Sequence, residues 1–373
     1  MKRISIFSAF PPIRGGISHF SARLTNALEK ENSVQTHTFK SQYPNWLFPG
    51  KSQFDFNQKS EFKSPVKRIV STFSPFSYFA LASSLKKDNS SLFITNYWMT
   101  IFAPLMGFTA RRLPKKTTKI AIVHNLIPHE KRFFDSVFNT YFIKSYDGFV
   151  ALSQHVYNDL SRFVAKEKII LLPHPSYDQF GKKENKEEAR QILKIDSSKK
   201  TLLFFGIIRQ YKGLDLLIDA FGMLDDTYQL IIAGEIYGND SALENQIKQN
   251  RNYERIHFRN EFIPDSEIKN YFSAADFLVL PYRSGTQSGV ASIAQTFDLP
   301  VIATNTGGIA ENIELQNGTL IEAPTPQAIQ KAILNAFNKE IKVIDSTQQA
   351  ASSINSWDEF AQKLILFSDS IAK

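Results

Sequence analysis

In the stretch Thr201-Leu202-Leu203-Phe204-Phe205-Gly206-Ile207-Ile208-Arg209-Gln210-Tyr211-Lys212-Gly213, an apolar β-strand runs into a glycine-rich loop. Residues 214–221 follow as an apolar helical segment, and residues 229–233 form the next apolar strand. Two parallel strands must be joined by a crossover, which is usually a helix. The order strand, loop, helix, strand therefore predicts an α/β domain with a parallel sheet.

The same alternation of short apolar runs and longer amphipathic segments continues along most of the chain. Further candidate strands are Ile4–Phe7, Ser91–Ile94, Lys119–Val123, Gly148–Ala151, Ile256–Arg259, Phe277–Leu280 and Val301–Thr304. Residues 34–91 are looser and rich in Phe, Ser and Lys. We expect irregular loops in the first part of this segment and a helix at Phe76–Lys87.

The length of 373 residues is about twice that of a usual domain, so two domains are expected. The segment Pro173-His174-Pro175 and the charged run at 182–188 indicate the boundary between them. We therefore expect domains at residues 1–178 and 179–355, followed by residues 356–373. This last segment contains a helix from Trp357 to Ile371 with apolar residues at helical spacing.

The net charge of +8 is distributed unevenly. Residues 1–180 carry 24 Lys and Arg against 11 Asp and Glu, a net +13, whereas the remainder carries −5. No helix-turn-helix, zinc-finger or RNP-type pattern occurs, so nucleic acid is not an expected partner. An anionic membrane surface, a phosphate-bearing acceptor or an ordinary solvated Lys-rich surface each explains the basic first domain.

Two further features bear on where the protein resides. The longest apolar run, Tyr97–Ala110, is too short to span a bilayer, but basic residues abut it and could place it on a membrane surface. These residues are Arg111, Arg112, Lys115 and Lys116. Cysteine is absent, and the first apolar stretch is a short strand stopped by Pro11-Pro12, unlike a signal peptide. We expect a cytoplasmic protein that contacts the inner face of the membrane peripherally.

Four loops at the ends of predicted strands are candidates for binding an anion. Paired glycines and a helix N-terminus expose backbone N–H groups, and Arg and Lys add charge. The strongest loop carries Arg209 and Lys212 between Gly206 and Gly213. The other candidate residues are Gly15 and Gly16 after the first strand, Thr286, Gln287, Ser288 and Gly289 before a helix, and Glu311 after Gly307-Gly308.

His124 directly follows the strand Lys119–Val123, at the edge of the sheet where ligands of open α/β sheets bind. A neutral imidazole there could bond a substrate hydroxyl, and a core histidine bonded to the backbone is the structural alternative. A metal site formed by His124, His129 and Glu130 lacks the H-E-x-x-H spacing, so no metal is expected.

These motifs, taken in order, resemble glycosyltransferase family 4 over nearly the whole chain. The resemblance rests on the Pro-Pro-x-x-Gly-Gly-Ile loop at residues 11–17, on strand-end His124, on Gly206-x-x-Arg209-x-x-Lys212-Gly213, and on residues 299–304 leading to Gly307-Gly308-x-x-Glu311. It implies the GT-B fold: two Rossmann-like parallel-sheet domains facing a central cleft, with the C-terminal helix crossing back to the first domain.

The resemblance also implies an activity: transfer of a sugar with retention of configuration from a nucleoside-diphosphate sugar, with no bound metal and no cofactor. Arg209 and Lys212 would neutralise the leaving diphosphate, Gly16 would abut the donor phosphates, and His124 would lie near the reacting sugar. The acceptor would be a glycan or a lipid-linked molecule in bacterial envelope polysaccharide or glycoconjugate synthesis.

The sequence departs from the family at one place. The family usually carries two glutamates with seven residues between them before the Leu-Pro-Val strand, and Gly285 and Ile293 occupy those positions here. The Thr-Gln-Ser-Gly form resembles a bacterial branch in which Thr286, Gln287 and Ser288 replace the first glutamate. The alternatives are a GT-B epimerase or phosphorylase, and a catalytically degenerate scaffold or sensor that binds sugar nucleotides.

Overall fold

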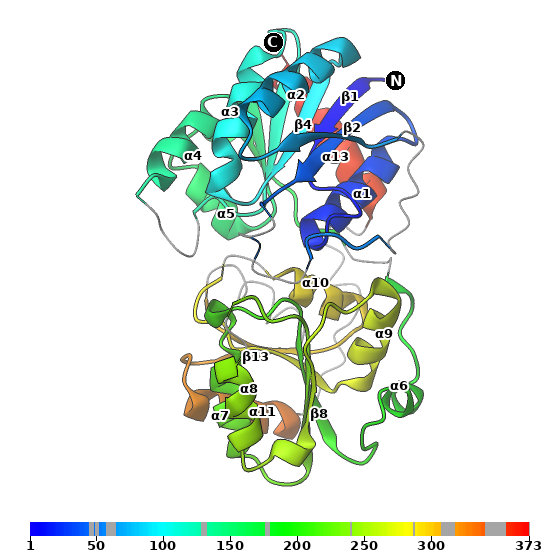
Figure 1. Ribbon diagram of the computed structural model, residues 1–373, viewed down its shortest axis with the longest axis vertical. Coiled ribbons are helices and arrows are strands. Elements are labelled where there is room, and N and C mark those ends of the chain that lie inside the picture. Colours follow the sequence, from blue (N-terminus) through cyan, green and yellow to red (C-terminus); the bar gives the residue numbers. More distant parts are fainter. Residues whose placement is uncertain are drawn as a thin grey trace. The chain divides into compact units, whose positions relative to one another are not determined.

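The computed structural model describes residues 1–44, 48, 52–56, 65–127, 133–175, 180–238, 241–285, 288–306, 318–339 and 356–372. The chain divides into two compact units, Met1–Pro175 with Ile354–Lys373 (the first unit) and Ser176–Ser353 (the second unit). Each unit is built on one parallel sheet, and Figure 1 shows helices packed against it. The predicted α/β class with two parallel sheets is confirmed.

The sheet of the first unit has the strand order β3-β2-β1-β4-β5-β6-β7, and every neighbouring pair is parallel. Its strands are β1 (Arg3–Phe7), β2 (Ser33–Ser41), β3 (Lys67–Ser71), β4 (Leu92–Tyr97), β5 (Thr118–Val123), β6 (Gly148–Ala151) and β7 (Ile169–Leu171). Its helices are α1 (Gly16–Leu28), α2 (Pro75–Asp88), η2 (Thr100–Phe102), α3 (Ala103–Arg112), α4 (Asp135–Ile143), α5 (Gln154–Leu160), η3 (Lys166–Lys168) and α13 (Trp357–Ser370).

The sheet of the second unit has the order β10-β9-β8-β11-β12-β13. Its strands are β8 (Lys200–Phe205), β9 (Tyr228–Ala233), β10 (Ile256–Arg259), β11 (Phe277–Leu280), β12 (Val301–Thr304) and β13 (Thr319–Ile321). Its helices are α6 (Lys186–Ile192), η5 (Gln210–Lys212), α7 (Leu214–Gly222), α8 (Ser241–Gln249), η6 (Tyr253–Arg255), α9 (Asp265–Ala274), α10 (Gly289–Thr296) and α11 (Pro326–Asn338).

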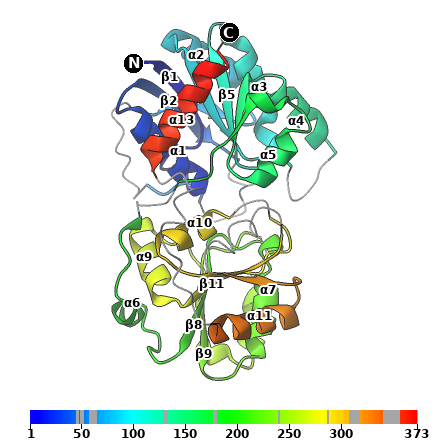
Figure 2. The same ribbon diagram turned by 180° about the vertical axis from the view of Figure 1, so that it is seen from behind.

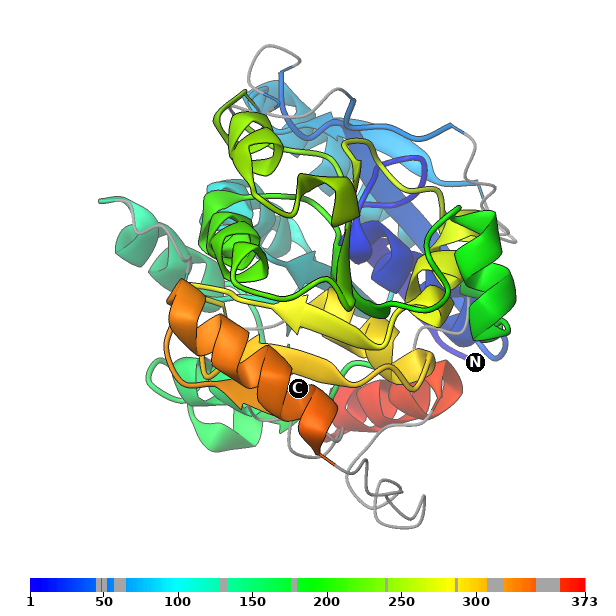
Figure 3. The same ribbon diagram turned by 90° about the horizontal axis from the view of Figure 1, so that it is seen from below.

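Successive residues of a strand point to opposite faces of the sheet, and in these strands both sets are largely apolar. Helices therefore cover both faces of each sheet. In the second unit, Leu203 and Phe205 of β8 pack toward α6, α9 and α10, while Leu202 and Phe204 pack toward α7, α8 and α11. Figure 3 shows α7 and α11 beside the strands of this sheet. In the first unit, α1 and α13 share one core with Ile4 and the other helices share the opposite one.

Helix α13 lies against α1 within the first unit, although the second unit separates the two helices in the sequence (Figure 2). It begins at a side-chain N-cap, since the hydroxyl of Ser356 accepts a hydrogen bond from the Glu359 backbone N–H. Its apolar stripe then covers the sheet. The ring of Phe20 on α1 lies edge-on to the rings of Trp357 and Phe360, at 5.1 and 5.6 Å between centroids.

Two expectations about the first unit are wrong. The first part of residues 34–91 contains strands β2 and β3 where irregular loops were expected. The sequence did not indicate β2 because polar Thr36, His37 and Thr38 fill buried positions of this strand, which therefore lacks an apolar pattern. The run Tyr97–Ala110 does not form an apolar membrane-contacting surface. It supplies the end of β4, η2 and most of α3, and Leu105, Met106 and Ala110 are fully buried there.

The buried stripe of α13 gives a test of how far this helix stabilises the first unit. Phe360 is fully buried, whereas Leu366 on the same helix is 68% exposed. Phe360→Ala should lower the free energy of unfolding of the first unit by about 3–5 kcal/mol, since it leaves a cavity. The matched variant Leu366→Ala should change it by less than about 0.5 kcal/mol. Thermal melts measure the loss of stability in the two variants. Equal melting temperatures would contradict this role of α13.

Candidate functional site

The loop after β8, residues 206–213, is held in a conformation that requires glycine at its ends. Gly206 and Gly213 have positive φ angles of 95° and 67°, which disfavour other residues. A Cβ atom on Gly213 would also lie 2.1 Å from the Pro281 carbonyl oxygen, at the end of β11. The loop therefore packs directly against the segment that follows β11.

Arg283 ties these two segments together. Its backbone N–H donates to the Tyr211 carbonyl at 2.7 Å, and its guanidinium donates to the Gln210 carbonyl at 2.9 Å and to the Asp215 carboxylate at 2.7 Å. Burial alone would raise the pKa of Asp215, but the bonds and charge of Arg283 lower it overall. Arg283 is thus a structural cation with its charge already paired. The sequence alone did not single it out.

Lys212 differs from Arg283 because no described residue pairs its charge. Its residue is 8% exposed, and no hydrogen bond or ion pair of its ammonium group occurs among the described residues. Burial, with the positive charge of Arg209 as a further cause, lowers its pKa. Arg209 itself is exposed and lies 5.7 Å from the ring centroid of Tyr237. A buried ammonium without a counter-charge is costly, so this position favours an incoming anion.

The first turn of α10 lies beside the same loop. A Cβ atom on Gly206 would be 3.2 Å from Val290 Cγ2 and 3.6 Å from Lys212 Nζ, so glycine leaves room for both. Ser288 is the N-cap of α10 but its side chain makes no capping bond, and its hydroxyl lies 3.3 Å from the Tyr282 hydroxyl. The first N–H groups of a helix lack internal partners and attract anions.

The structure therefore brings together Gly206, Lys212, Ser288 and Gly289, all within the second unit. We name this group the anion site. Arg209 stands on the same loop. Thr286, Gln287 and Glu311, together with the Gly307-Gly308 loop, lie outside the described residues.

The remaining site candidates belong to the first unit. Gly15, with a φ of 113°, is the N-cap of α1, and Gly16 is the first residue of that helix. His124 follows β5; its backbone N–H donates to the Tyr97 carbonyl at 2.8 Å, and its Nε2 lies 2.9 Å from Asn96 Oδ1. Burial, and then the neighbouring His174, lower the pKa of His124 to about 3, so the imidazole is neutral near pH 7.

Metal ligation has no support among the described residues. No group of three or more His, Asp or Glu side chains placed to hold a metal occurs within them, and His129 and Glu130 lie outside. The described helices likewise include none that is long and apolar enough to cross a bilayer.

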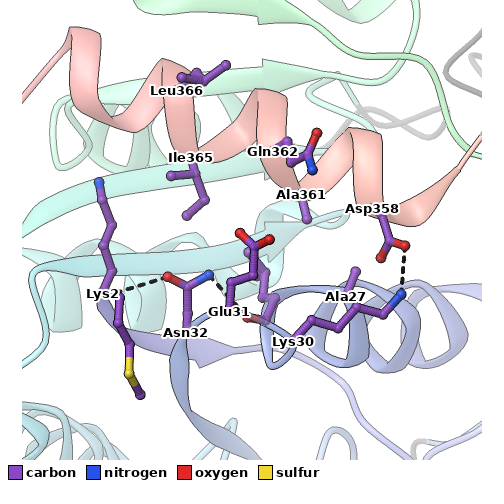
Figure 4. Close-up of a pocket in the computed structure, with 12 residues that line it drawn as sticks. Lys2, Ala27, Lys30, Glu31, Asn32, Asp358, Ala361, Gln362, Ile365 and Leu366 are labelled. Atoms are coloured by element: carbon purple, nitrogen blue, oxygen red, sulfur yellow. Dashed lines mark hydrogen bonds and ion pairs between the residues drawn. The ribbon is translucent and has the colours of Figure 1, made fainter.

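A separate hollow of about 570 Å³ lies in the first unit where the N-terminus, α1 and α13 meet (Figure 4). Both lysines that line it are paired with carboxylates. Lys30 Nζ lies 2.6 Å from Asp358 Oδ2, and Lys2 forms an ion pair with Asp369. None of the candidate residues lines it, and its two lysines are already paired, so it is a weaker candidate than the anion site.

Comparison with known proteins shows what parts of the chain are similar to. Residues 185–353 match the family described as glycosyl transferases group 1. The chain is 28% identical over 252 residues to an uncharacterized glycosyltransferase of Methanocaldococcus jannaschii, covering 65% of this chain and 66% of that protein. It is 24% identical to a D-inositol 3-phosphate glycosyltransferase of Corynebacterium diphtheriae, covering 52% of this chain and 48% of that protein. The chain thus spans between about half and two thirds of the length of these relatives.

Solved structures give the fold. Sucrose-phosphate synthase of Thermosynechococcus elongatus superposes with a TM-score of 0.72 at 18% identity, covering 100% of this chain and 96% of that one. Anabaena HepE in complex with UDP and glucose has a TM-score of 0.72 at 16% identity, covering 100% and 98%. The fold is therefore GT-B. Most of the second unit matches the group 1 glycosyl transferases, and about half to two thirds of the chain is similar to proteins named glycosyltransferases.

The uncompensated ammonium predicts where a nucleoside diphosphate binds. Lys212→Ala and Arg209→Ala should each weaken UDP binding tenfold or more, since a hydrogen bond to a charged group contributes about 1.5–3 kcal/mol. Lys331→Ala is the matched control, because Lys331 is an exposed cation of the same unit, 3.1 Å from Glu322. Isothermal titration calorimetry measures the three affinities.

The lowered pKa of Lys212 adds a pH dependence to the same measurement. Only the protonated amine attracts the anion, and its pKa lies below the ordinary value of 10.5. Affinity for UDP should therefore fall as the pH rises through that lower pKa. Lys212→Arg should abolish this decline, since a guanidinium stays charged. Wild-type affinity in both alanine variants would place the site elsewhere.

Proposed function

We propose that this protein is a retaining, metal-independent glycosyltransferase that moves a hexose from a nucleoside-diphosphate sugar to a glycan or lipid-linked acceptor. The observation that carries the proposal is the anion site: Lys212 is buried, unpaired among the described residues and adjacent to the first turn of α10. The match of residues 185–353 to the group 1 glycosyl transferases supports the reaction class, and the resemblance of the motifs to family 4 supports retention of configuration.

The proposed chemistry follows from where charge develops. Cleavage of the bond between the sugar and the phosphate leaves negative charge on the departing diphosphate. Fixed donors stabilise that charge as it forms, without reorganising in the transition state. Lys212 and Arg209 supply two cations, and Ser288 and Gly289 supply N–H groups. These groups do the electrostatic work that a bound divalent metal would otherwise do, and the chain has no D-x-D motif.

His124 is the proposed group at the reacting sugar. Its neutral imidazole can bond a sugar hydroxyl, so it contributes orientation and does not oppose the positive charge that develops on the ring. Gly15 and Gly16 contribute the N-terminus of α1 on the same unit.

The names of similar proteins favour certain substrates. The HepE structures contain UDP, and one contains UDP-glucose, which supports a nucleotide-sugar donor. A lipopolysaccharide core biosynthesis mannosyltransferase of Rhizobium meliloti is 28% identical over 40% of this chain and 44% of its own length. This relative supports an acceptor in envelope polysaccharide or lipopolysaccharide synthesis.

A second candidate function is a catalytically degenerate protein that binds sugar nucleotides as a scaffold or sensor. The observation that favours it is the absence of the family's glutamate pair at Gly285 and Ile293. Ile293 lies on α10 and is 8% exposed in the core of the second unit. An acidic group at this position would meet apolar neighbours. Binding without turnover would identify this alternative.

The activity is tested by incubating the protein with UDP-, GDP- and ADP-sugars in excess EDTA and measuring released nucleotide and transferred sugar. We expect transfer from one donor to persist in EDTA. His124→Ala should reduce kcat by about a hundredfold, as for other positioned catalytic groups, with nucleotide affinity unchanged. His155→Ala on α5 is the control for losing a histidine that is not at the site. Activity abolished by EDTA and restored by manganese would contradict metal independence.

Peripheral contact with an anionic membrane is the remaining part of the proposal, and it is best assigned to the outer face of α2, α3 and α4. The helices contact each other in that order, as Figure 1 shows. Phe76 and Phe79 on α2 are 86% and 54% exposed, and Phe133 before α4 is 97% exposed. The Arg112 guanidinium lies 5.0 Å from the ring centroid of Phe79.

The charge on this outer face has one sign. Its exposed cations are Lys86, Lys87, Arg111, Arg112, Lys115 and Lys116. The three helices contain two acidic residues. The side chain of Asp88 is buried, and Asp135 is buried as a whole residue. Exposed aromatics among unopposed cations suit an anionic lipid interface, where rings enter the headgroup layer and cations meet phosphates.

Vesicle binding tests this surface. The wild-type protein should co-sediment with phosphatidylglycerol vesicles at low salt and not with phosphatidylcholine vesicles, and binding should weaken as salt rises because exposed charges are screened. The double variant Phe76→Ser, Phe79→Ser should lose most of this binding. Leu366→Ser, an equally exposed apolar position on α13, should retain it. Undiminished binding by the double variant would assign the membrane contact to another face.

A further inference from the structure

His124 is connected to α1 through a buried polar network. Asn96, the penultimate residue of β4, is fully buried, as are Ser8 after β1 and Ser21 on α1. Asn96 Nδ2 lies 3.1 Å from Ser8 Oγ and 3.0 Å from Ser21 Oγ, while Oδ1 lies 2.9 Å from His124 Nε2. Buried polar groups are costly unless bonded, so this network has a defined arrangement of protons.

The number of available protons decides which way the Asn96 amide faces. Ser21 Oγ lies 2.7 Å from the Ile17 carbonyl oxygen and 2.7 Å from Ser8 Oγ, and both serine hydroxyls also contact the same edge of the amide. These four contacts need four protons, and the two hydroxyl groups supply only two. The edge of the amide that faces the two serines is therefore the NH₂ group, which has one proton for each.

The opposite edge of the amide is then the carbonyl oxygen, which can only accept. His124 Nε2 must consequently carry the ring proton and donate it to Asn96 Oδ1. In a neutral imidazole only one nitrogen is protonated, so Nδ1 has a lone pair. Nδ1 has no hydrogen-bond partner within the part of the chain that the structure describes.

We propose that Asn96 is a positioning residue that holds His124 as the Nε2–H tautomer, so that Nδ1 accepts a hydrogen bond from a hydroxyl group of the donor sugar. The choice of ligand rests on the proposed function. The assignment of the tautomer does not, since it follows from the network alone. The Phe20 ring, 4.8 Å from the imidazole and edge-on to it, limits the ring's rotation from the α1 side.

A negative charge at position 96 should raise the pKa of His124. Asn96→Asp keeps the shape of the side chain but faces Nε2–H with a carboxylate, which stabilises the imidazolium and raises the pKa of His124. Among the described residues, His174 after β7 is the titratable group whose charge acts on His124, and it opposes this rise. Phe20 on α1 and Asn96 on β4 are uncharged. Asn96→Leu removes the acceptor and should free the choice of tautomer.

Nuclear magnetic resonance measures the tautomer without any substrate. Long-range ¹H–¹⁵N spectra of protein labelled in the histidine rings distinguish protonated from unprotonated nitrogens, and His124→Gln identifies the resonances by their loss. We expect wild-type His124 to be protonated on Nε2 at pH 7, Asn96→Leu to show a mixture or the other tautomer, and Asn96→Asp to titrate at higher pH. Asn158→Asp, an exposed position on α5 of the same unit, should leave His124 unchanged.

The outcomes separate this proposal from the proposed function. A wild-type ring protonated on Nδ1, or an unchanged tautomer in Asn96→Leu, would overturn the proposal even if transfer is observed. If Asn96→Leu does not fold, the tautomer in the wild-type spectrum and the pKa of His124 in Asn96→Asp still test the proposal. In an active enzyme, Asn96→Leu should also lower kcat about tenfold or more with UDP affinity unchanged, because the anion site lies in the second unit.

Discussion

A parallel sheet must be covered on both faces, and this requirement organises the whole protein. Every strand-to-strand connection then crosses over the sheet, and the loops that leave the strands gather at one edge of it. The described candidate residues all lie in such loops or begin the helices that follow them: Gly15 after β1, His124 after β5, Lys212 after β8 and Ser288 after β11. The site residues thus follow from the architecture, although long stretches of sequence separate them.

Two nearby cations in the second unit show how structural and functional charges differ. The sequence singled out Lys212 but not Arg283. Arg283 is neutralised by Asp215 and by backbone carbonyls, so its charge serves to hold two loops in register. Lys212 is buried beside glycines that leave space around its ammonium group. Only the second arrangement leaves an attraction for a ligand.

The first unit shows the same separation of roles among neutral groups. Asn96, Ser8 and Ser21 satisfy one another's hydrogen bonds and leave one acceptor, which binds His124. Burial keeps that imidazole uncharged. A neutral ring held in one tautomer is suited to bonding a hydroxyl group, and it does not bring a positive charge next to a sugar that becomes positive during transfer.

The sequence by itself determined the α/β class, the strands that are apolar throughout, and the glycine-rich loops with Arg209, Lys212 and His124, because apolar runs and glycines are local signals. It could not reveal β2, whose buried positions are polar, or the burial of the run 97–110. The pairing of Arg283 with Asp215 and the contact of Asn96 with His124 join residues 68 and 28 positions apart. Tertiary structure alone decided these, because burial and hydrogen-bond partners depend on which elements the sheet brings together.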